Sequence, residues 1–201
     1  SDTVALARLA RRDDDLALAC ASPAGVSAHV RTAAAMLAQA GLDDSVLECG
    51  AHWPSHDASS RALAAAGAQP SALHNNCSGK HAGFVCLGCV LAGHREPRGF
   101  LAGYVRPEHA VMREVNAAVA AVTGCDLSRA PQGTDGCSIP TYAVPLRHLA
   151  LAFARVATGQ GLRPGHAAAA RRLRAAVASA PFMVAGSGRF DTRVMERLGE
   201  R

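Results

Sequence analysis

Lys80 is the only lysine in the 201-residue chain, and the 20 other basic residues are arginine. Two further reactive side chains stand beside it: Cys77 three residues earlier and His81 one residue later. An arginine guanidinium stays protonated in proteins, whereas a lysine amine can lose its proton and act as a lone-pair donor or base. The segment is therefore a candidate for metal binding or base catalysis. The alternative is a surface lysine retained by chance in an arginine-biased sequence.

The spacing places these side chains together if a helix begins near Cys77. Residues 78–92 are predicted to form a helix entered through a polar turn, so Cys77, Lys80 and His81 would share one face of its first turn. The positive end of the helix dipole favours the thiolate form of Cys77, which is the form that binds metal. Sulfur and nitrogen donors together suit zinc. Two local donors do not hold zinc, so a third must come from elsewhere.

Several cysteines compete for that third position. The Cys86–Cys89 pair resembles a zinc knuckle or redox motif, but Cys86 would lie on the opposite side of the helix from Cys77. The apolar flanks of the pair favour two thiols packed in the core. Cys137 stands in the glycine-rich segment "GTDGCSIP", where backbone can approach a ligand closely. Asp135 is close enough in sequence to bind substrate or orient a ligand. The remaining cysteines are Cys20 and Cys49, expected in the core, and Cys125, which could serve either purpose.

The helices and strands that must position these residues are predicted from apolar runs and from the proline and glycine residues that begin and end them. Short buried strands are predicted at 16–22 and 45–50, and a loop at 130–140. The segment 141–159 begins extended and becomes helical. Further helices are predicted at 28–40, with Ser27 as its cap, and at 61–67, 78–92, 106–124 and 163–181. The pattern indicates an α-rich α/β or α+β domain with few strands.

The composition narrows the class of protein. Hydrophobic residues make up 49% of the chain and aromatic residues 4%, so the core is aliphatic. The net charge is +5, but the arginines are scattered, which argues against nucleic-acid binding. No apolar run is long enough for a membrane span, and no signal peptide is recognised. Seven cysteines without a secretory mark favour free thiols or metal ligands in the cytoplasm.

Six motifs, in this order, resemble the asparaginase II family, the thermolabile type of L-asparaginase. They are "LALACAS" (16–22), "GAHWP" (50–54), "LHNNCSGKHAGF" (73–84), "YVRPEH" (104–109), "GTDGCSIPTYAVPL" (133–146) and "GSGRFDT" (186–192). The resemblance covers essentially the whole chain and treats 1–201 as one domain. "HNNCSGKHAG" and "DGCSIPT" are its most specific parts.

The resemblance implies hydrolysis of L-asparagine to L-aspartate and ammonia. It implies an arrangement similar to serine β-lactamases, with helices around an antiparallel sheet. It also implies acyl transfer to a serine nucleophile, with the lysine of an S-x-x-K motif as base. The zinc ligands of the family correspond to Cys77, Lys80 and Cys137, and zinc is the expected cofactor. The lone lysine would then persist because arginine cannot become a neutral donor.

The chain departs from the family pattern in its acyl-transfer residues. No S-x-x-K occurs in the 201 residues, and the family's "ASHSG" reads "ASPAG", so Ser22 matches the first serine and Ala24 replaces the second. We expect a chain shorter than the family at both ends, with the metal half of the site present and little or no asparaginase activity.

These observations give three groups of candidate site residues. The candidate catalytic residues are Ser22, Lys80 and His81; the candidate substrate-binding residues are Asn76, Asp135, Arg189 and Asp191; the candidate metal ligands are Cys77, Lys80 and Cys137. Asn76 could instead cap the helix, and Arg189 could instead pair with Asp191. Two other functions stay open: a structural zinc module using His74 or His81 as further ligands, and a thiol redox protein using Cys86 and Cys89. The expected partner is L-asparagine, with a homodimer possible and no nucleic acid or membrane.

Overall fold

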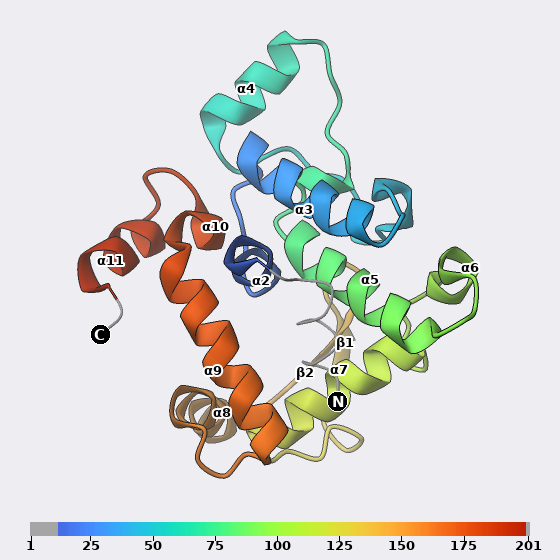
Figure 1. The fold of residues 1–201 in the computed structure, drawn as a ribbon, viewed down its shortest axis with the longest axis vertical. Helices are drawn as coiled ribbons and strands as arrows, with labels where there is room; N and C mark the ends of the chain where they lie inside the picture. The colour runs from blue at the N-terminus through green and yellow to red at the C-terminus, as the bar shows by residue number, and fades with distance from the viewer. Residues whose placement is uncertain (1–11, 200–201) are drawn as a thin grey trace.

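The computed structural model describes residues 12–199, and helices dominate it (Figure 1). Two strands form a single antiparallel sheet, so the prediction of an α-rich α+β chain is confirmed. The likeness to serine β-lactamases stays a prediction. The elements are α2 (Asp13–Ala19), α3 (Ser27–Gln39), η1 (Asp44–Val46), α4 (Asp57–Ala65), η2 (Ala72–His74), α5 (Ser78–Ala92), α6 (Pro97–Leu101), α7 (Ala110–Thr123), β1 (Gln132–Thr134), β2 (Pro140–Tyr142), α8 (Leu146–Thr158), α9 (Pro164–Ser179), α10 (Pro181–Ala185) and α11 (Phe190–Leu198).

Helix α5 is the centre of the fold, as Figure 1 shows. It is apolar on all sides, which is the pattern of a helix surrounded by other elements, and it packs against α2, α3, α6 and α7. Two glycines of α5 allow α2 and α6 to pack closely against this helix. A Cβ atom at Gly79 would overlap the backbone of Leu18 on α2, and one at Gly88 would overlap the side chain of Leu101 on α6. The helix that carries Lys80 is therefore fixed from several directions.

The two predicted buried strands are wrong. The apolar run 16–22 lies mostly within helix α2, which begins with three aspartates in its first turn; acidic side chains stabilise a helix N-terminus. The run 45–50 contains the end of the short 3-10 helix η1, followed by irregular backbone. A strand needs a neighbour to pair with, and neither segment has one among residues 12–199. The N-terminal stretch 1–11, where no signal peptide is recognised, lies outside the described residues.

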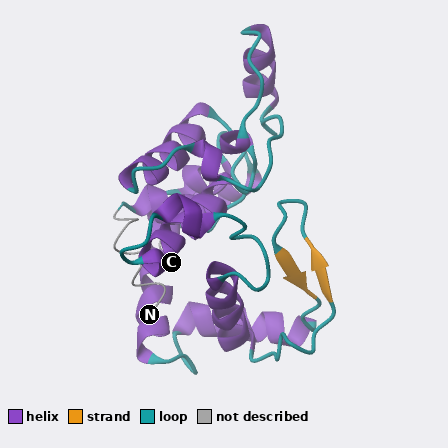
Figure 2. Ribbon diagram, turned by 90° about the vertical axis from the view of Figure 1, so that its right-hand side faces the viewer, coloured by secondary structure: helices purple, strands orange, loops and turns teal. Residues whose placement is uncertain are grey.

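The predicted loop at 130–140 contains a hairpin instead. Strands β1 and β2 pair with Gln132 opposite Tyr142 and Thr134 opposite Pro140. The tip is a turn closed by hydrogen bonds from Ser138 N to Asp135 O (2.9 Å) and from Asp135 N to Ile139 O (2.9 Å). Figure 2 shows the hairpin at one edge of the molecule. Strand β1 is exposed and strand β2 is partly buried, whereas Cys137 at the tip is only 3% exposed, so the tip is the part of the hairpin that packs into the protein.

Most of the predicted helices are confirmed, because their ends carry clear signals. Helix α7 begins after His109, whose Nδ1 accepts the Val111 N–H, and ends before Gly124 in the left-handed region. Helix α9 begins with Pro164 at its first position. Ser27 is the first residue of α3 rather than the residue that caps it.

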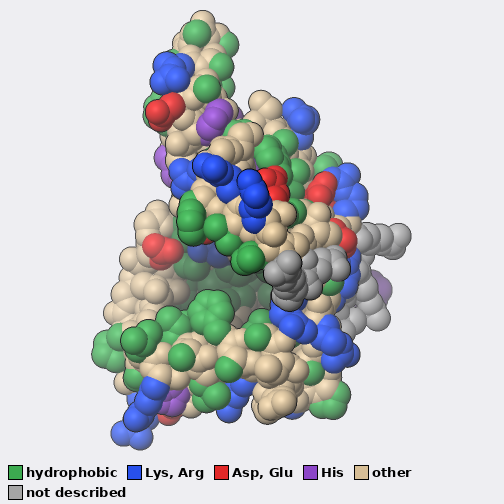
Figure 3. All heavy atoms as spheres, turned by 90° about the vertical axis from the view of Figure 1, so that its left-hand side faces the viewer, with side chains coloured by type: hydrophobic (Ala, Val, Ile, Leu, Met, Phe, Trp, Pro, Cys, Tyr) green, Lys and Arg blue, Asp and Glu red, His purple; other side chains and the backbone are tan. Residues whose placement is uncertain are grey.

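Helix α8 exposes large apolar side chains. Leu146 is 79% and Phe153 is 70% exposed, and Leu149 and Leu151 are also open to solvent. Figure 3 shows hydrophobic side chains gathered around a hollow on one face of the molecule. A second copy of the chain as the partner of this surface stays a prediction. No helix in the described part of the chain is long and apolar enough to cross a membrane.

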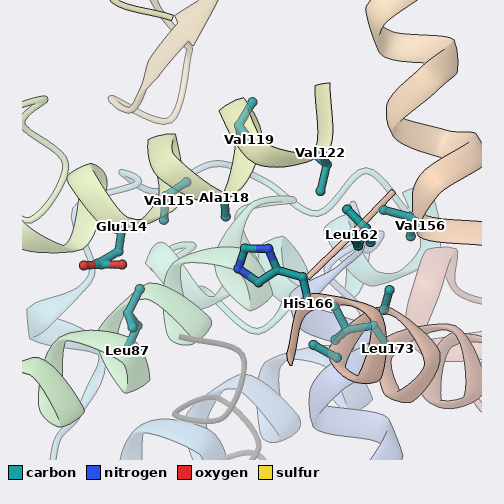
Figure 4. A pocket seen from close by; sticks show the side chains of 12 residues that line it. Leu87, Glu114, Val115, Ala118, Val119, Val122, Val156, Leu162, His166 and Leu173 are labelled. Atoms are coloured by element: carbon teal, nitrogen blue, oxygen red, sulfur yellow. The ribbon is translucent and has the colours of Figure 1, made fainter. Parts of the chain in front are cut away.

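A separate apolar pocket of about 290 Å³ lies between α7 and α9. Figure 4 shows the His166 imidazole among aliphatic side chains of these helices, with Glu114 at one end. None of the candidate site residues lines this pocket, so the reactive side chains must be sought elsewhere.

Candidate functional site

The entrance to α5 is built by Asn75, which is buried. Its side-chain oxygen accepts the Cys77 backbone N–H at 2.8 Å, which is the local turn that asparagine side chains favour two residues along the chain. Its amide nitrogen donates to the carbonyls of Cys49 (2.9 Å) and Gly50 (3.0 Å). Cys77 is the residue immediately before the first helical position. The asparagine thus ties the start of the helix to the segment 48–50.

Lys80 meets the tip of the hairpin. Its Nζ donates to the Cys137 Sγ at 3.4 Å and lies 3.9 Å from the Asp135 Oδ2. The Cys137 thiol donates in turn to the Asp135 carboxylate at 3.4 Å. The three side chains form a triangle of amine, thiol and carboxylate, although 57 residues separate Lys80 from Cys137 in the sequence.

The charges in this triangle shift the pKa values of its members. Burial lowers the pKa of Lys80, but the neighbouring Cys77 and Cys137 sulfurs outweigh that effect, and its pKa is raised overall. Burial raises the pKa of Cys137, against the pull of Lys80. Backbone hydrogen bonding at Gly136 lowers the pKa of Asp135. At neutral pH the amine and the Cys137 thiol therefore hold their protons in the absence of a metal.

One distance within the candidate donor set is compatible with a zinc ion. In a tetrahedral zinc site with nitrogen at about 2.05 Å and sulfur at about 2.3 Å, these two atoms stand about 3.6 Å apart. The Lys80 Nζ and Cys137 Sγ atoms are 3.4 Å apart. Cys77 is close enough to shift the pKa values of both residues. Among residues 12–199, no group of three His, Cys, Asp or Glu side chains is arranged to hold a metal, so the candidate depends on lysine as a ligand.

Cys49 is the residue that sequence reasoning missed. The sequence predicts it in the core and it is buried, and it lies near enough to Cys77, Cys137 and Lys80 for their charges to influence its pKa. Burial is the main cause that raises its pKa to about 11, and its thiol donates to the Ala72 carbonyl at 3.6 Å. A third thiol therefore borders the site. Cys20, also expected in the core, is exposed at the end of α2.

His81 does not share the face of Lys80 that meets the hairpin. It is fully buried, and its Nδ1 lies 2.5 Å from the hydroxyl of Tyr104, which is also fully buried. Burial lowers the pKa of His81 to about 4. This burial does not suit a residue that must reach a substrate, and the assignment of His81 to catalysis stays a prediction. A neutral imidazole inside the core holds the helix rather than reaching a ligand.

The two serines nearest the motifs differ in exposure. Ser78 is fully buried and its hydroxyl has no hydrogen-bond partner in the described part of the chain, which excludes attack on a substrate from solvent. Ser22 is exposed in the loop between α2 and α3. Ala24, two residues later, is buried and donates its backbone N–H to the Ala185 carbonyl at 3.2 Å. Of the two serines, Ser22 alone is accessible.

The predicted substrate-binding residues are not all brought together. Asp135 lies at the metal candidate, as described above. Asn76 is exposed and pairs with His52, whose Nε2 accepts the Asn76 backbone N–H at 3.0 Å. Arg189 and Asp191 lie at the start of α11, which packs on α10. No hydrogen bond or ion pair between residues 12 and 199 joins them to each other or to the hairpin.

Cys86 and Cys89 are set in the apolar helix as small hydrophobic residues. Burial raises the pKa of Cys86 to about 12 and also raises that of Cys89. The Cys86 thiol points to the Met36 carbonyl on α3. Reactive thiols need a lowered pKa and access to solvent. Both pKa values are raised and Cys86 is buried, whereas Cys89 is half-buried, so the pair lacks the electrostatic property of a redox site.

Comparison with known proteins agrees with the motifs. A search of curated proteins finds no match to the chain. The family model described as L-asparaginase II matches residues 2–201, which is essentially the whole sequence. The amine, thiol and carboxylate cluster is formed by the two most specific motifs of the resemblance. The chain belongs to the L-asparaginase II family.

Proposed function

We propose that this chain carries the metal-binding half of a site that hydrolyses L-asparagine to L-aspartate and ammonia. Cys77, Lys80 and Cys137 would hold zinc, and Asp135 would orient Cys137 or contact the substrate. The single observation that carries the proposal is the 3.4 Å approach of the Lys80 amine to the Cys137 thiol. Family membership supports an asparaginase-type hydrolase acting on amides.

The residues of the site have distinct tasks in this proposal. Cys77 and Lys80 come from one helical turn, and Cys137 comes from the opposing hairpin. Asp135 accepts from the Cys137 thiol, so its carboxylate favours the orientation in which that sulfur faces Lys80. A bound zinc ion supplies Lewis acidity toward an amide carbonyl or water.

The acyl-transfer half is not provided by the residues of this chain. Ser22 is exposed and has no hydrogen-bond partner in the described range, and the sequence contains no S-x-x-K. An unassisted serine hydroxyl is a weak nucleophile. A lysine bound to metal cannot also deprotonate serine, because its lone pair is committed. We therefore expect the 201-residue chain to release ammonia from L-asparagine slowly or not at all.

The metal proposal is tested by elemental analysis of the purified chain. We expect one zinc per wild-type chain and none in Cys77→Ser. Cys125→Ser is the matched control and should keep its zinc, because Cys125 is a half-buried thiol after α7 with no hydrogen bond to Cys77, Lys80 or Cys137 in the described part of the chain. Zinc retained in Cys77→Ser at the wild-type level would contradict the ligand assignment.

The catalytic proposal is tested by ammonia release in the same preparations. Turnover at ordinary enzyme rates, on the order of 1–1000 per second, would show that the S-x-x-K segment is dispensable. Stoichiometric zinc without turnover, even when extended family sequence is added, would favour the non-catalytic zinc module. In that module His74 and His81 were the further candidate ligands, but His74 accepts from the Ser71 backbone (3.0 Å) and His81 is bonded to Tyr104.

The cytoplasmic location and the homodimer remain proposals of the same kind. The first rests on seven cysteines without a secretory mark. The second rests on the exposed apolar face of α8.

A further inference from the structure

The 48–50 segment makes backbone hydrogen bonds that lead to both sides of Lys80. On one side, the carbonyls of Cys49 and Gly50 accept from the Asn75 amide, whose oxygen holds the Cys77 N–H. This path ends at the residue that begins α5. It is local to the helix entrance and is largely buried, since Asn75 is 5% exposed.

On the other side, the path runs through two buried rings. The Glu48 N–H donates to the Tyr104 hydroxyl at 3.0 Å, and that hydroxyl lies 2.5 Å from the His81 Nδ1. Donation from the Tyr104 hydroxyl to the His81 Nδ1 uses the buried hydroxyl proton and leaves the His81 Nε2 as the ring nitrogen without a partner among the described residues. The Glu48 carboxylate also accepts the Gly103 N–H at 2.7 Å, which fixes the backbone beside Tyr104.

Rigid packing completes the arrangement around His81. Its ring lies edge-on to both Phe84 and Tyr104, with centroids 5.5 Å and 5.6 Å away. Rotation of the imidazole would break these ring contacts and the hydrogen bond between His81 Nδ1 and the Tyr104 hydroxyl. Because His81 is fixed, the backbone of Lys80, the preceding residue, is also fixed, and the Lys80 side chain is directed toward Cys137.

We propose that the 48–50 segment positions Cys77 and Lys80 for metal binding by holding the first turn of α5 at two points, through Asn75 and through Tyr104 with His81. The inference rests on the proposed zinc site and deepens it. Tyr104 and His81 are positioning residues that touch neither metal nor substrate. Ligands held in place before binding lose less freedom on binding, and removing such supports typically weakens metal affinity about 10–100-fold.

The test is zinc affinity, measured by competition with a chelator. Tyr104→Phe removes one hydroxyl and should weaken zinc binding about 10–100-fold. Tyr142→Phe is the matched control, since Tyr142 is the other tyrosine of the chain and lies on β2. Cys86→Ala is the stability control, because it perturbs the buried body of α5 away from the site; it should lower stability and leave zinc affinity unchanged.

A conservative replacement separates positioning from packing. His81→Leu should lose affinity as Tyr104→Phe does, and His81→Asn should recover most of it, because the asparagine oxygen can accept from Tyr104 near the position of Nδ1. Equal zinc affinity in wild type and Tyr104→Phe would overturn the inference. So would a loss in Cys86→Ala as large as that in Tyr104→Phe at matched stability.

A second readout needs no metal. Because Lys80 is the only lysine, ¹³C-labelled lysine gives one side-chain NMR signal in the metal-free protein. Tyr104→Phe should move or broaden that signal, and Tyr142→Phe should not. If wild type binds no zinc, the proposed metal site fails, and the lysine signal still decides the positioning: a signal unchanged in Tyr104→Phe refutes it.

Discussion

Acidification should destabilise the protein through His81. The imidazole is fully buried, and burial lowers its pKa from 6.5 to about 4. The unfolded chain therefore takes up a proton at a higher pH than the folded protein does. Stability from this residue is present above the unfolded pKa and is lost as the pH falls toward the folded pKa. The two values give a loss of about 2 kcal/mol between pH 7 and pH 5.

The assay is denaturant unfolding at both pH values, with a chelator present so that metal binding does not contribute. His81→Asn cannot titrate at this position and keeps an acceptor for Tyr104, so its loss between the two pH values should be about 2 kcal/mol smaller than that of wild type. His94→Asn, at an exposed histidine, should keep the wild-type pH dependence. The variants must unfold with similar m-values for the comparison to hold.

His29 also lowers the stability of the protein in acid. The effect of His81 must therefore be obtained as the difference between wild type and His81→Asn. His29 is also fully buried, and burial lowers its pKa, while its Nε2 bonds to the Phe182 carbonyl at 3.0 Å. Both histidines therefore reduce stability in acid. The reasoning about His81 is refuted if His81→Asn and wild type lose equal stability between the two pH values.

Three further outcomes are expected. Gly79→Ala should destabilise the fold by about 3 kcal/mol or more, measured by denaturant unfolding, because its Cβ would meet the backbone of Leu18, which cannot move aside easily; a neutral effect would mean that α2 can shift. Replacing Cys86 and Cys89 together by alanine should lower stability and leave the zinc content unchanged, and zinc lost from a folded protein would contradict their place in the core. Zinc affinity should rise with pH, because Lys80 must release a proton to bind; Lys80→Met should show a shallower pH dependence in chelator competition, and an identical slope would remove lysine from the ligand set.

Local signals explain why some elements could be predicted from sequence. Residues 78–92 were predicted as a helix, and α5 spans those residues. The glycine after α7 and the proline at the start of α9 act on the adjacent backbone alone, so no tertiary information is needed. The strand prediction for 16–22 is wrong because a short apolar stretch is equally compatible with a buried strand and with a buried helix. The preceding aspartates were the signal for a helix start.

The site shows where sequence reasoning stops. The spacing of Cys77 and Lys80 is local, but the approach of Cys137 depends on a hairpin 57 residues away. The sequence of this hairpin predicts a loop, because its strands are only three residues long and contain glycine and proline. His81 was assigned to the reactive face from helical periodicity. Its actual direction is set by Tyr104, which no local pattern identifies.

The contrast between the exposed strand β1 and the buried tip of the hairpin has a kinetic consequence. A two-stranded hairpin is marginally stable by itself in water, so its hold on the body depends on the tip, where Cys137 meets Lys80. Opening of the hairpin alone would remove Cys137 and Ile139 from the core and leave the helices packed, so we expect it to cost less free energy than unfolding of the whole protein. An ion would enter and leave through that opening, and the frequency of hairpin opening, rather than unfolding of the protein, would set its exchange rate. A bound ion would in turn join the hairpin to α5 and slow its own release.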